Sequence, residues 1–241
     1  MIRIRESYNQ MSRYPNTIFW LSLIGLVIIA GSLRFGSLDW DNGFDYTPHP
    51  DERALLMKSD EISFPELSNI SSLLNPEEST WNPNWFAYGS LPIYLLKILE
   101  SLDSIIPNTI DKDVRILART LSSLSDIGII IGVTLLSKTI LNRKYALLIG
   151  ILVSFSVIHI QLSHYFAVDT LATFFCIWGI FFLCRISSYG YKSDYVFAGI
   201  FIGLAISSKI SVLPIYGALF TAHFLYILNQ DIKQINIKNA M

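Results

Sequence analysis

Residues 164–184, HYFAVDTLATFFCIWGIFFLC, join a short polar junction to an uncharged apolar run that begins at Thr170. A helix crosses a bilayer with roughly 17–25 such residues. Five similar stretches occur elsewhere, so that the full set of apolar runs is 18–33, 121–137 (broken by Asp126), 145–162, 170–184, 195–208 and 210–228. The run at 195–208 is short and must borrow flanking residues or thin the bilayer to span. The sequence therefore predicts an all-α integral membrane protein with about six transmembrane helices.

The composition agrees with this prediction and excludes several other classes. Of the 241 residues 52% are hydrophobic and 15% are charged, with 18 Lys and Arg against 19 Asp and Glu. Without a basic surplus the chain lacks the charge that neutralises nucleic-acid phosphates, so no nucleic-acid partner is expected. Cys176 and Cys184 are eight residues apart on one predicted helix, too far to bridge, and no Cys-x-x-Cys pair suggests a thiolate metal site.

The placement of charge orients the predicted helices. With a cytoplasmic N-terminus, the short inner segments are basic and the long first outer segment is acidic, as the positive-inside tendency requires. The predicted organisation is a cytoplasmic tail at 1–17, a first transmembrane helix at 18–35, an extracytoplasmic loop with amphipathic helices at 36–115, a five-helix transmembrane region at 116–229 and a cytoplasmic tail at 230–241. The expected location is the plasma membrane of a prokaryote, or the endoplasmic reticulum of a eukaryote.

Residues 91–106 are a further candidate for a transmembrane helix. Lys97 and Glu100 fall on one helical face and leucines and isoleucines on the other, which favours a helix lying in the membrane interface. Treating it as a span would place the basic cluster at 138–144 outside. We therefore predict an interfacial helix.

Three polar features lie on the outer side in this topology. The first, Asp51 with Glu52, is expected in the first turn of a helix at 51–59, where a fixed carboxylate suits a general base. The alternative is a plain acidic N-cap. The second feature, His164 with Asp169, precedes the fourth span. These two residues could belong to a reaction site, or His164 could anchor the membrane interface while Asp169 caps the span.

The third feature is Lys209, between the last two spans. It could reach water or neutralise a lipid-linked phosphate, and Arg53 and Arg119 are further cations on that side. Asp126 is an intramembrane carboxylate whose partner would be Arg119 or a group on a neighbouring span. The spacing of small residues suggests close helix packing at Gly199, Gly203, Ala205 and Ser207.

Two further possibilities concern ligands of this outer face. The aromatic segment 81–90, with Trp85 and Tyr88, could stack on a sugar ring or anchor the loop to lipid headgroups. A divalent metal could be held by imidazole and carboxylate groups, although none of them shows the spacing of a known metal motif. Those groups are His49, Asp51, Glu52, His164 and Asp169.

The motifs together resemble a known family. HPDER at 49–53, YGSLPIY at 88–94, RILAR at 115–119, HYFAVD at 164–169 and GLAISSK at 203–209 are similar, in that order, to the membrane glycosyltransferases of the GT-C superfamily. The closest likeness is to the protein O-mannosyltransferase and aminoarabinose-transferase-like branch.

The resemblance implies transfer of a sugar from a polyprenyl-phosphate donor to a hydroxyl of a protein or glycolipid acceptor on the extracytoplasmic face. It assigns catalytic roles to Asp51, Glu52 and Asp169. Donor-phosphate contacts would come from Lys209, Arg119 and Arg53, and acceptor or sugar contacts from His49, His164, Trp85 and Tyr88. No resident metal is assigned.

Members of this branch are longer and carry more spans. The resemblance therefore predicts an N-terminal portion, with a C-terminal companion polypeptide as a possible partner. The alternatives are an inactive fragment of such a transferase and a non-catalytic membrane protein, such as a transporter half or an assembly subunit.

Overall fold

The computed structural model describes residues 15–65, 75–105 and 113–238, with the backbone alone for 103–105 and 231–238. Regular structure in these residues is entirely helical, which confirms the predicted fold class. The helices are α2 (Asn16–Phe35), α3 (Pro50–Glu61), α4 (Leu91–Ile105), α5 (Val114–Ile140), α6 (Arg143–Ser154), α7 (Val157–Ser163), α8 (Val168–Tyr189), α9 (Lys192–Ser208), the short 3-10 helix η2 (Ile210–Val212) and α10 (Ile215–Lys238).

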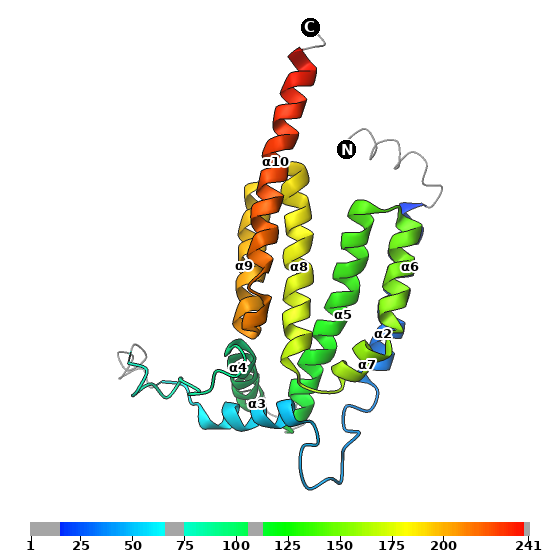
Figure 1. Cartoon of the computed structure of the whole chain (residues 1–241). Coiled ribbons are helices and arrows are strands. Elements are labelled where there is room, and N and C mark those ends of the chain that lie inside the picture. Colours follow the sequence, from blue (N-terminus) through cyan, green and yellow to red (C-terminus); the bar gives the residue numbers. More distant parts are fainter. Residues whose placement is uncertain (1–14, 66–74, 106–112, 239–241) are drawn as a thin grey trace.

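Four segments within these described ranges are long and apolar enough to cross a membrane: α2, α5, α8 and Ile210–Gln230. The bent pair of α6 and α7 adds a fifth if it forms one span. The remaining predicted span, 195–208, lies in α9, which has 17 residues and is not among these candidate spans. Figure 1 shows α9 alongside α8 and α10.

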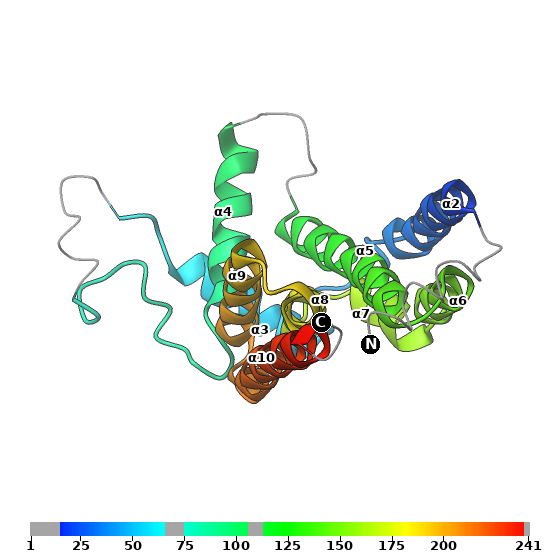
Figure 2. The same ribbon diagram turned by 90° about the horizontal axis from the view of Figure 1, so that it is seen from above.

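The spanning helices form an elongated bundle with two helices lying across one end. Helix α8 contacts α5, α9 and α10, while α5 also contacts α2 and α6. Helices α3 and α4 lie across the bundle end, and Figure 2 shows α4 along its length in the view from above. Helix α4 therefore does not run alongside the apolar helices of the bundle, as a further span at 91–106 would.

The main hydrophobic core lies where these transverse helices meet the bundle. Leu55 of α3, with Ile93 and Leu96 of α4, packs against Ala118 of α5 and Leu171 of α8. All five side chains are buried. The core therefore fixes the transverse helices directly over the ends of α5 and α8.

The predicted span at 145–162 is wrong as a single straight helix. Helices α6 and α7 are separated at Phe155 and Ser156 and differ in direction by 57°. A break inside a bundle frees carbonyl groups that need new donors. Arg34 of α2 supplies one, because its Nη1 donates to the carbonyl oxygen of Ser154 at 3.1 Å.

The same arginine belongs to a buried ionic network. Arg34 pairs through Nε with Asp126, whose other carboxylate oxygen lies 2.6 Å from Nδ1 of His159 on α7. Of the two partners considered for Asp126, the neighbouring span is correct and Arg119 is not. The network ties α2, α5 and α7 together beside the bend.

Close packing of α5 on α8 depends on two glycines that the sequence analysis did not single out. A Cβ at Gly128 would lie 2.3 Å from the Phe174 ring, and one at Gly132 would lie 2.7 Å from Ile177. They form a Gly-x-x-x-Gly pair of the kind that lets membrane helices approach closely. Of the small residues expected to pack on α9, Ala205 is buried in the core. The expected role of Gly199 and Gly203 is wrong, since a Cβ at either would meet no atom within 4 Å.

We therefore expect Gly128→Val to destabilise the bundle by about 1–3 kcal/mol, the usual cost of overpacking. The measurement is the midpoint of thermal unfolding in detergent. Gly199→Val is the matched control, because space is open around Gly199. Equal midpoints for the two variants would contradict the packing assigned to Gly128.

Candidate active site

Asp51 and Glu52, in the first turn of α3, differ in their exposure to solvent. The N-cap is His49, not Asp51: the His49 imidazole accepts a hydrogen bond from the Glu52 backbone N–H at 3.3 Å, and Pro50 is the first helical residue. Successive residues on a helix are about 100° apart. Glu52 is fully buried, whereas Asp51 is partly exposed.

Asp51 meets Tyr88 from the loop before α4. Burial raises the pKa of the Tyr88 hydroxyl more than any other effect. The negative charge of Asp51 and a hydrogen bond to its carboxylate raise this pKa further. The cation of Lys209 opposes this shift, and the carboxylate of Asp169 adds to it. Tyr88 therefore stays protonated at neutral pH and can donate a hydrogen bond.

Asp169 and Lys209 form an ion pair beside this tyrosine. The Lys209 ammonium lies 2.6 Å from a carboxylate oxygen of Asp169 and 6.0 Å from the centre of the Tyr88 ring. Both side chains keep part of their surface exposed, 30% for Lys209 and 48% for Asp169. Asp51, Tyr88, Asp169 and Lys209 are called the Asp51 cluster below.

The helix ends explain how the four residues meet. Asp169 lies in the first turn of α8, and Lys209 is the C-cap of α9 with an extended backbone. Gly89 joins the Tyr88 loop to this point, because its N–H donates to the Ser208 carbonyl oxygen at 3.0 Å. A Cβ at Gly89 would lie 1.9 Å from the Ser207 carbonyl oxygen, so only glycine fits the contact.

A second charged group, the Arg119 clamp, holds α3 against the bundle. The clamp consists of Arg119 on α5 with Glu52 and Asp41, all at most 1% exposed. Arg119 donates to both carboxylates at 2.6–2.8 Å and to the Leu38 carbonyl oxygen at 2.7 Å. These five contacts use all five guanidinium N–H donors.

This geometry does not support the expected roles of Arg119 and Glu52. Arg119 is fully buried and has no N–H left for a donor phosphate. The Glu52 carboxylate is occupied by Arg119 and by the backbone N–H of Phe166, which donates to it at 3.0 Å. Both residues instead join α3, α5 and the segment before α8.

Of the other predicted site residues, Trp85 packs against Tyr88 of the Asp51 cluster, and the rest make their contacts elsewhere. Trp85 packs against the core with its ring edge-to-face on Tyr88 at 5.6 Å. The exposed guanidinium of Arg53 lies 5.9 Å from the centre of the Tyr46 ring. The ring nitrogens of His164 each lie 2.8 Å from a backbone carbonyl oxygen, and the His49 ring stands 4.5 Å from that of Tyr165.

The possible metal site is not assembled in the described part of the chain. Within residues 15–65, 75–105 and 113–238, no three His, Cys, Asp or Glu side chains are grouped so that they could hold a metal ion. The His49 imidazole accepts from the backbone N–H of Glu52, the Glu52 carboxylate is held by Arg119, and Asp169 is paired with Lys209.

Asp41 is the structural residue that sequence reasoning missed. It is one of many acids in the outer loop, and its contact with Arg119 joins residues 78 positions apart. The hydrogen bonds from Arg119 hold the pKa of the Asp41 carboxyl below its usual range. No spacing rule could have distinguished this acid from its neighbours.

Apolar helices long enough to span a membrane define an all-α integral membrane protein, and its candidate site lies at one end of the helix bundle. A family model described as dolichyl-phosphate-mannose-protein mannosyltransferase matches residues 108–240. The chain belongs to this family and is a membrane glycosyltransferase of the GT-C type. The match includes Asp169 and Lys209, while Asp51 and Tyr88 precede it. No curated protein and no solved structure matches the chain significantly.

Proposed function

We propose that this protein transfers a sugar from a polyprenyl-phosphate donor to an acceptor hydroxyl at the extracytoplasmic face of the membrane. The observation that carries the proposal is the Asp51 cluster, in which a carboxylate and a partly exposed ammonium face one tyrosine. Family membership favours this chemistry over a transporter half or an assembly subunit.

Each member of the cluster has a role that this transfer requires. Asp51 accepts the proton of the acceptor hydroxyl as the oxygen attacks the anomeric carbon. The bond from that carbon to the phosphate oxygen breaks, and Lys209 stabilises the negative charge on the departing polyprenyl phosphate. Asp169 orients Lys209, and the protonated Tyr88 hydroxyl orients Asp51.

The Arg119 clamp has a positioning role in this proposal. It fixes Glu52, and therefore the first turn of α3, so that the neighbouring Asp51 is held beside Tyr88. Preorganised groups stabilise a transition state without having to reorient during the reaction. We therefore assign Glu52 and Arg119 to positioning, and not to the chemical step or to phosphate binding.

The distribution of charge supports an extracytoplasmic site. The helix ends opposite the Asp51 cluster carry Lys138, Arg143, Lys144, Arg185 and Lys192, and Figure 1 places those ends together. Basic residues are enriched on the cytoplasmic side of membrane proteins. The α3 and α4 end then faces outward, in a prokaryotic plasma membrane or in the lumen of the endoplasmic reticulum.

We expect Lys209→Gln to lower the rate of transfer about 100-fold or more, the effect of losing one donor to a developing charge. The measurement is the release of polyprenyl phosphate from radiolabelled polyprenyl-phosphate mannose, in membranes containing the full chain and acceptor. Lys209→Arg keeps a cation and should retain part of the rate.

Lys192→Gln is the matched control, because Lys192 is an exposed lysine at the opposite bundle end. Its rate should equal that of the unaltered protein. If Lys209→Gln were as active as this control, Lys209 would have no part in donor binding. Absence of donor turnover by the unaltered protein would instead favour a non-catalytic role.

A further inference from the structure

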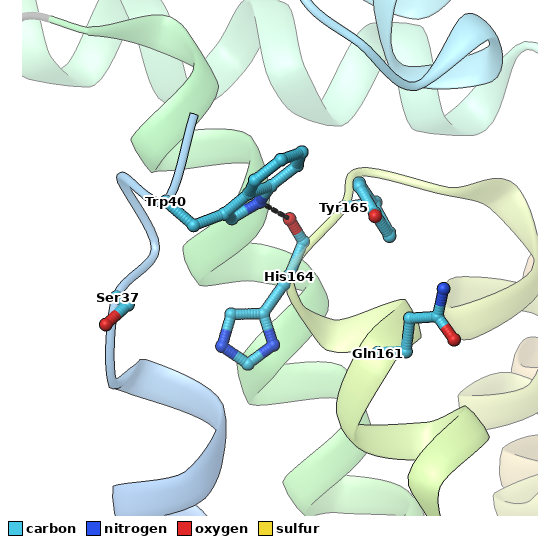
Figure 3. A pocket seen from close by; sticks show the side chains of 5 residues that line it. All are labelled: Ser37, Trp40, Gln161, His164 and Tyr165. Atoms are coloured by element: carbon cyan, nitrogen blue, oxygen red, sulfur yellow. Dashed lines mark hydrogen bonds between the residues drawn. The ribbon is translucent and has the colours of Figure 1, made fainter. Parts of the chain in front are cut away.

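We propose that a shallow pocket beside the Arg119 clamp binds a neutral sugar ring. The pocket lies between the segment that follows α2 and the end of α7, and its lining residues are Ser37, Trp40, Gln161, His164 and Tyr165. Figure 3 shows these five side chains. The biological use of the pocket rests on the proposed sugar transfer, but its binding of sugar can be measured separately.

The size of the pocket suits one ring. Its volume is about 260 Å³, just below the range of about 300–1,000 Å³ usual for small-molecule sites.

The walls of the pocket are held in place before any ligand binds. The Trp40 indole N–H donates to the His164 carbonyl oxygen at 3.3 Å, as Figure 3 shows, and the Trp40 and Tyr165 rings meet edge-to-face at 5.5 Å. Nε2 of His164 lies 2.8 Å from the Gly36 carbonyl oxygen, which ties the two walls together. A rigid site loses little conformational entropy when its ligand binds.

The backbone at Ser37 is also unusual. Ser37 has a φ of 60°, a left-handed conformation that non-glycine residues seldom adopt. Such residues persist where the surrounding structure fixes them, and they occur often at binding sites. Here the conformation lies in the turn that leads from α2 to Trp40.

The free polar groups identify the kind of ligand. Ser37 and Gln161 are exposed, and neither the Ser37 hydroxyl nor the Gln161 amide has a hydrogen-bond partner in the described part of the protein. No Lys, Arg, Asp or Glu lines the pocket. Aromatic walls with an amide and a hydroxyl suit a ring that has an apolar face and several hydroxyls, whereas a phosphate would require a cation.

One wall of the pocket contacts the helix that carries Asp51. The His49 ring lies 4.5 Å from the Tyr165 ring on the pocket wall, and His49 is also the N-cap of the helix that carries Asp51. A sugar in this pocket would therefore lie on the same bundle end as the Asp51 cluster. It would belong either to the acceptor or to the donor.

The test is saturation-transfer NMR of methyl α-D-mannopyranoside with the purified full chain, in a detergent that has no sugar headgroup. We expect transfer to the ring protons of the glycoside, and about tenfold weaker binding to Trp40→Ala. Gln161→Ala should weaken binding about threefold without disturbing the fold, because Gln161 is exposed. Losses of this size correspond to one stacking or hydrogen-bonding contact.

Two control variants separate this inference from the proposed function. Trp20→Ala removes an exposed tryptophan near the other end of α2 and should leave binding unchanged. Asp51→Asn should lower the rate of sugar transfer at least about 100-fold but retain glycoside binding. Failure of the unaltered protein to bind the glycoside would overturn the inference, and so would equal binding by the Gln161→Ala and Trp20→Ala variants.

Competition between the glycoside and polyprenyl-phosphate mannose identifies whether the bound sugar belongs to the donor or to the acceptor. If polyprenyl-phosphate mannose displaces the glycoside, the pocket holds the donor sugar. If the glycoside stays bound in the presence of the donor lipid, the pocket holds a sugar of the acceptor. Both results support a sugar site, provided that Gln161→Ala weakens binding.

Discussion

Replacement of Asp51 with asparagine is expected to lower the rate of sugar transfer about 100- to 10,000-fold, the usual contribution of a positioned general base. Asparagine keeps the shape of the side chain and can still accept a hydrogen bond from Tyr88, but it cannot take the proton of the attacking hydroxyl. The loss should therefore appear in kcat, with little change in the KM for the donor lipid. Initial rates at several concentrations of polyprenyl-phosphate mannose measure both quantities.

The matched control is Asp60→Asn, because Asp60 is an exposed acid on the same helix. Its rate should equal that of the unaltered protein, and both variants should have the same unfolding midpoint. If Asp51→Asn transferred sugar as fast as Asp60→Asn, Asp51 would not be the base.

The second large effect is expected at Arg119. Replacement by methionine leaves the carboxylates of Asp41 and Glu52 buried without a cation, and breaking a buried ion pair in this way costs about 3–5 kcal/mol. We expect Arg119→Met to lower the midpoint of thermal unfolding in detergent markedly. The rate of sugar transfer should fall as well, because the clamp holds the helix that carries Asp51.

Two comparisons make the role of the clamp specific. Arg115→Met, one turn earlier on α5, removes a partly exposed arginine that pairs most closely with Asp113 and lies 3.4 Å from Asp41. It should cost less than Arg119→Met, because Asp41 and Glu52 both keep the Arg119 cation. The triple variant Arg119→Met, Asp41→Asn and Glu52→Gln leaves no uncompensated charge and should recover part of the lost stability. Equal midpoints for Arg119→Met and Arg115→Met would contradict the clamp.

The fold class was predictable because each apolar run carries its own signal. The runs at 18–33, 121–137 and 170–184 correspond to α2, α5 and α8, and the amphipathic pattern at 91–106 corresponds to the transverse helix α4. The bend between α6 and α7 was not predictable. It depends on Arg34, which lies 120 residues before the carbonyl group that it stabilises.

The candidate site divides in the same way. Topology alone predicted that Asp51, Asp169 and Lys209 would lie on one side, and the structure brings them together around Tyr88. The separate tasks of Asp51 and Glu52 were not predictable. Neighbouring acids in a sequence look equivalent until the arginine that buries one of them is located.

The proposed chemistry requires the whole Asp51 cluster to lie on one side of the membrane, and labelling of single cysteines can measure this. Single cysteines would be placed at positions 51, 169 and 144 after Cys176 and Cys184 have been replaced by alanine. Oriented membrane vesicles would then be treated with a thiol reagent that cannot cross the bilayer. We expect positions 51 and 169 to react from the extracytoplasmic side, and position 144 to react only after the membrane is opened. Reaction of positions 51 and 169 from opposite sides would contradict it, because the two carboxylates could not then serve one lipid-linked donor.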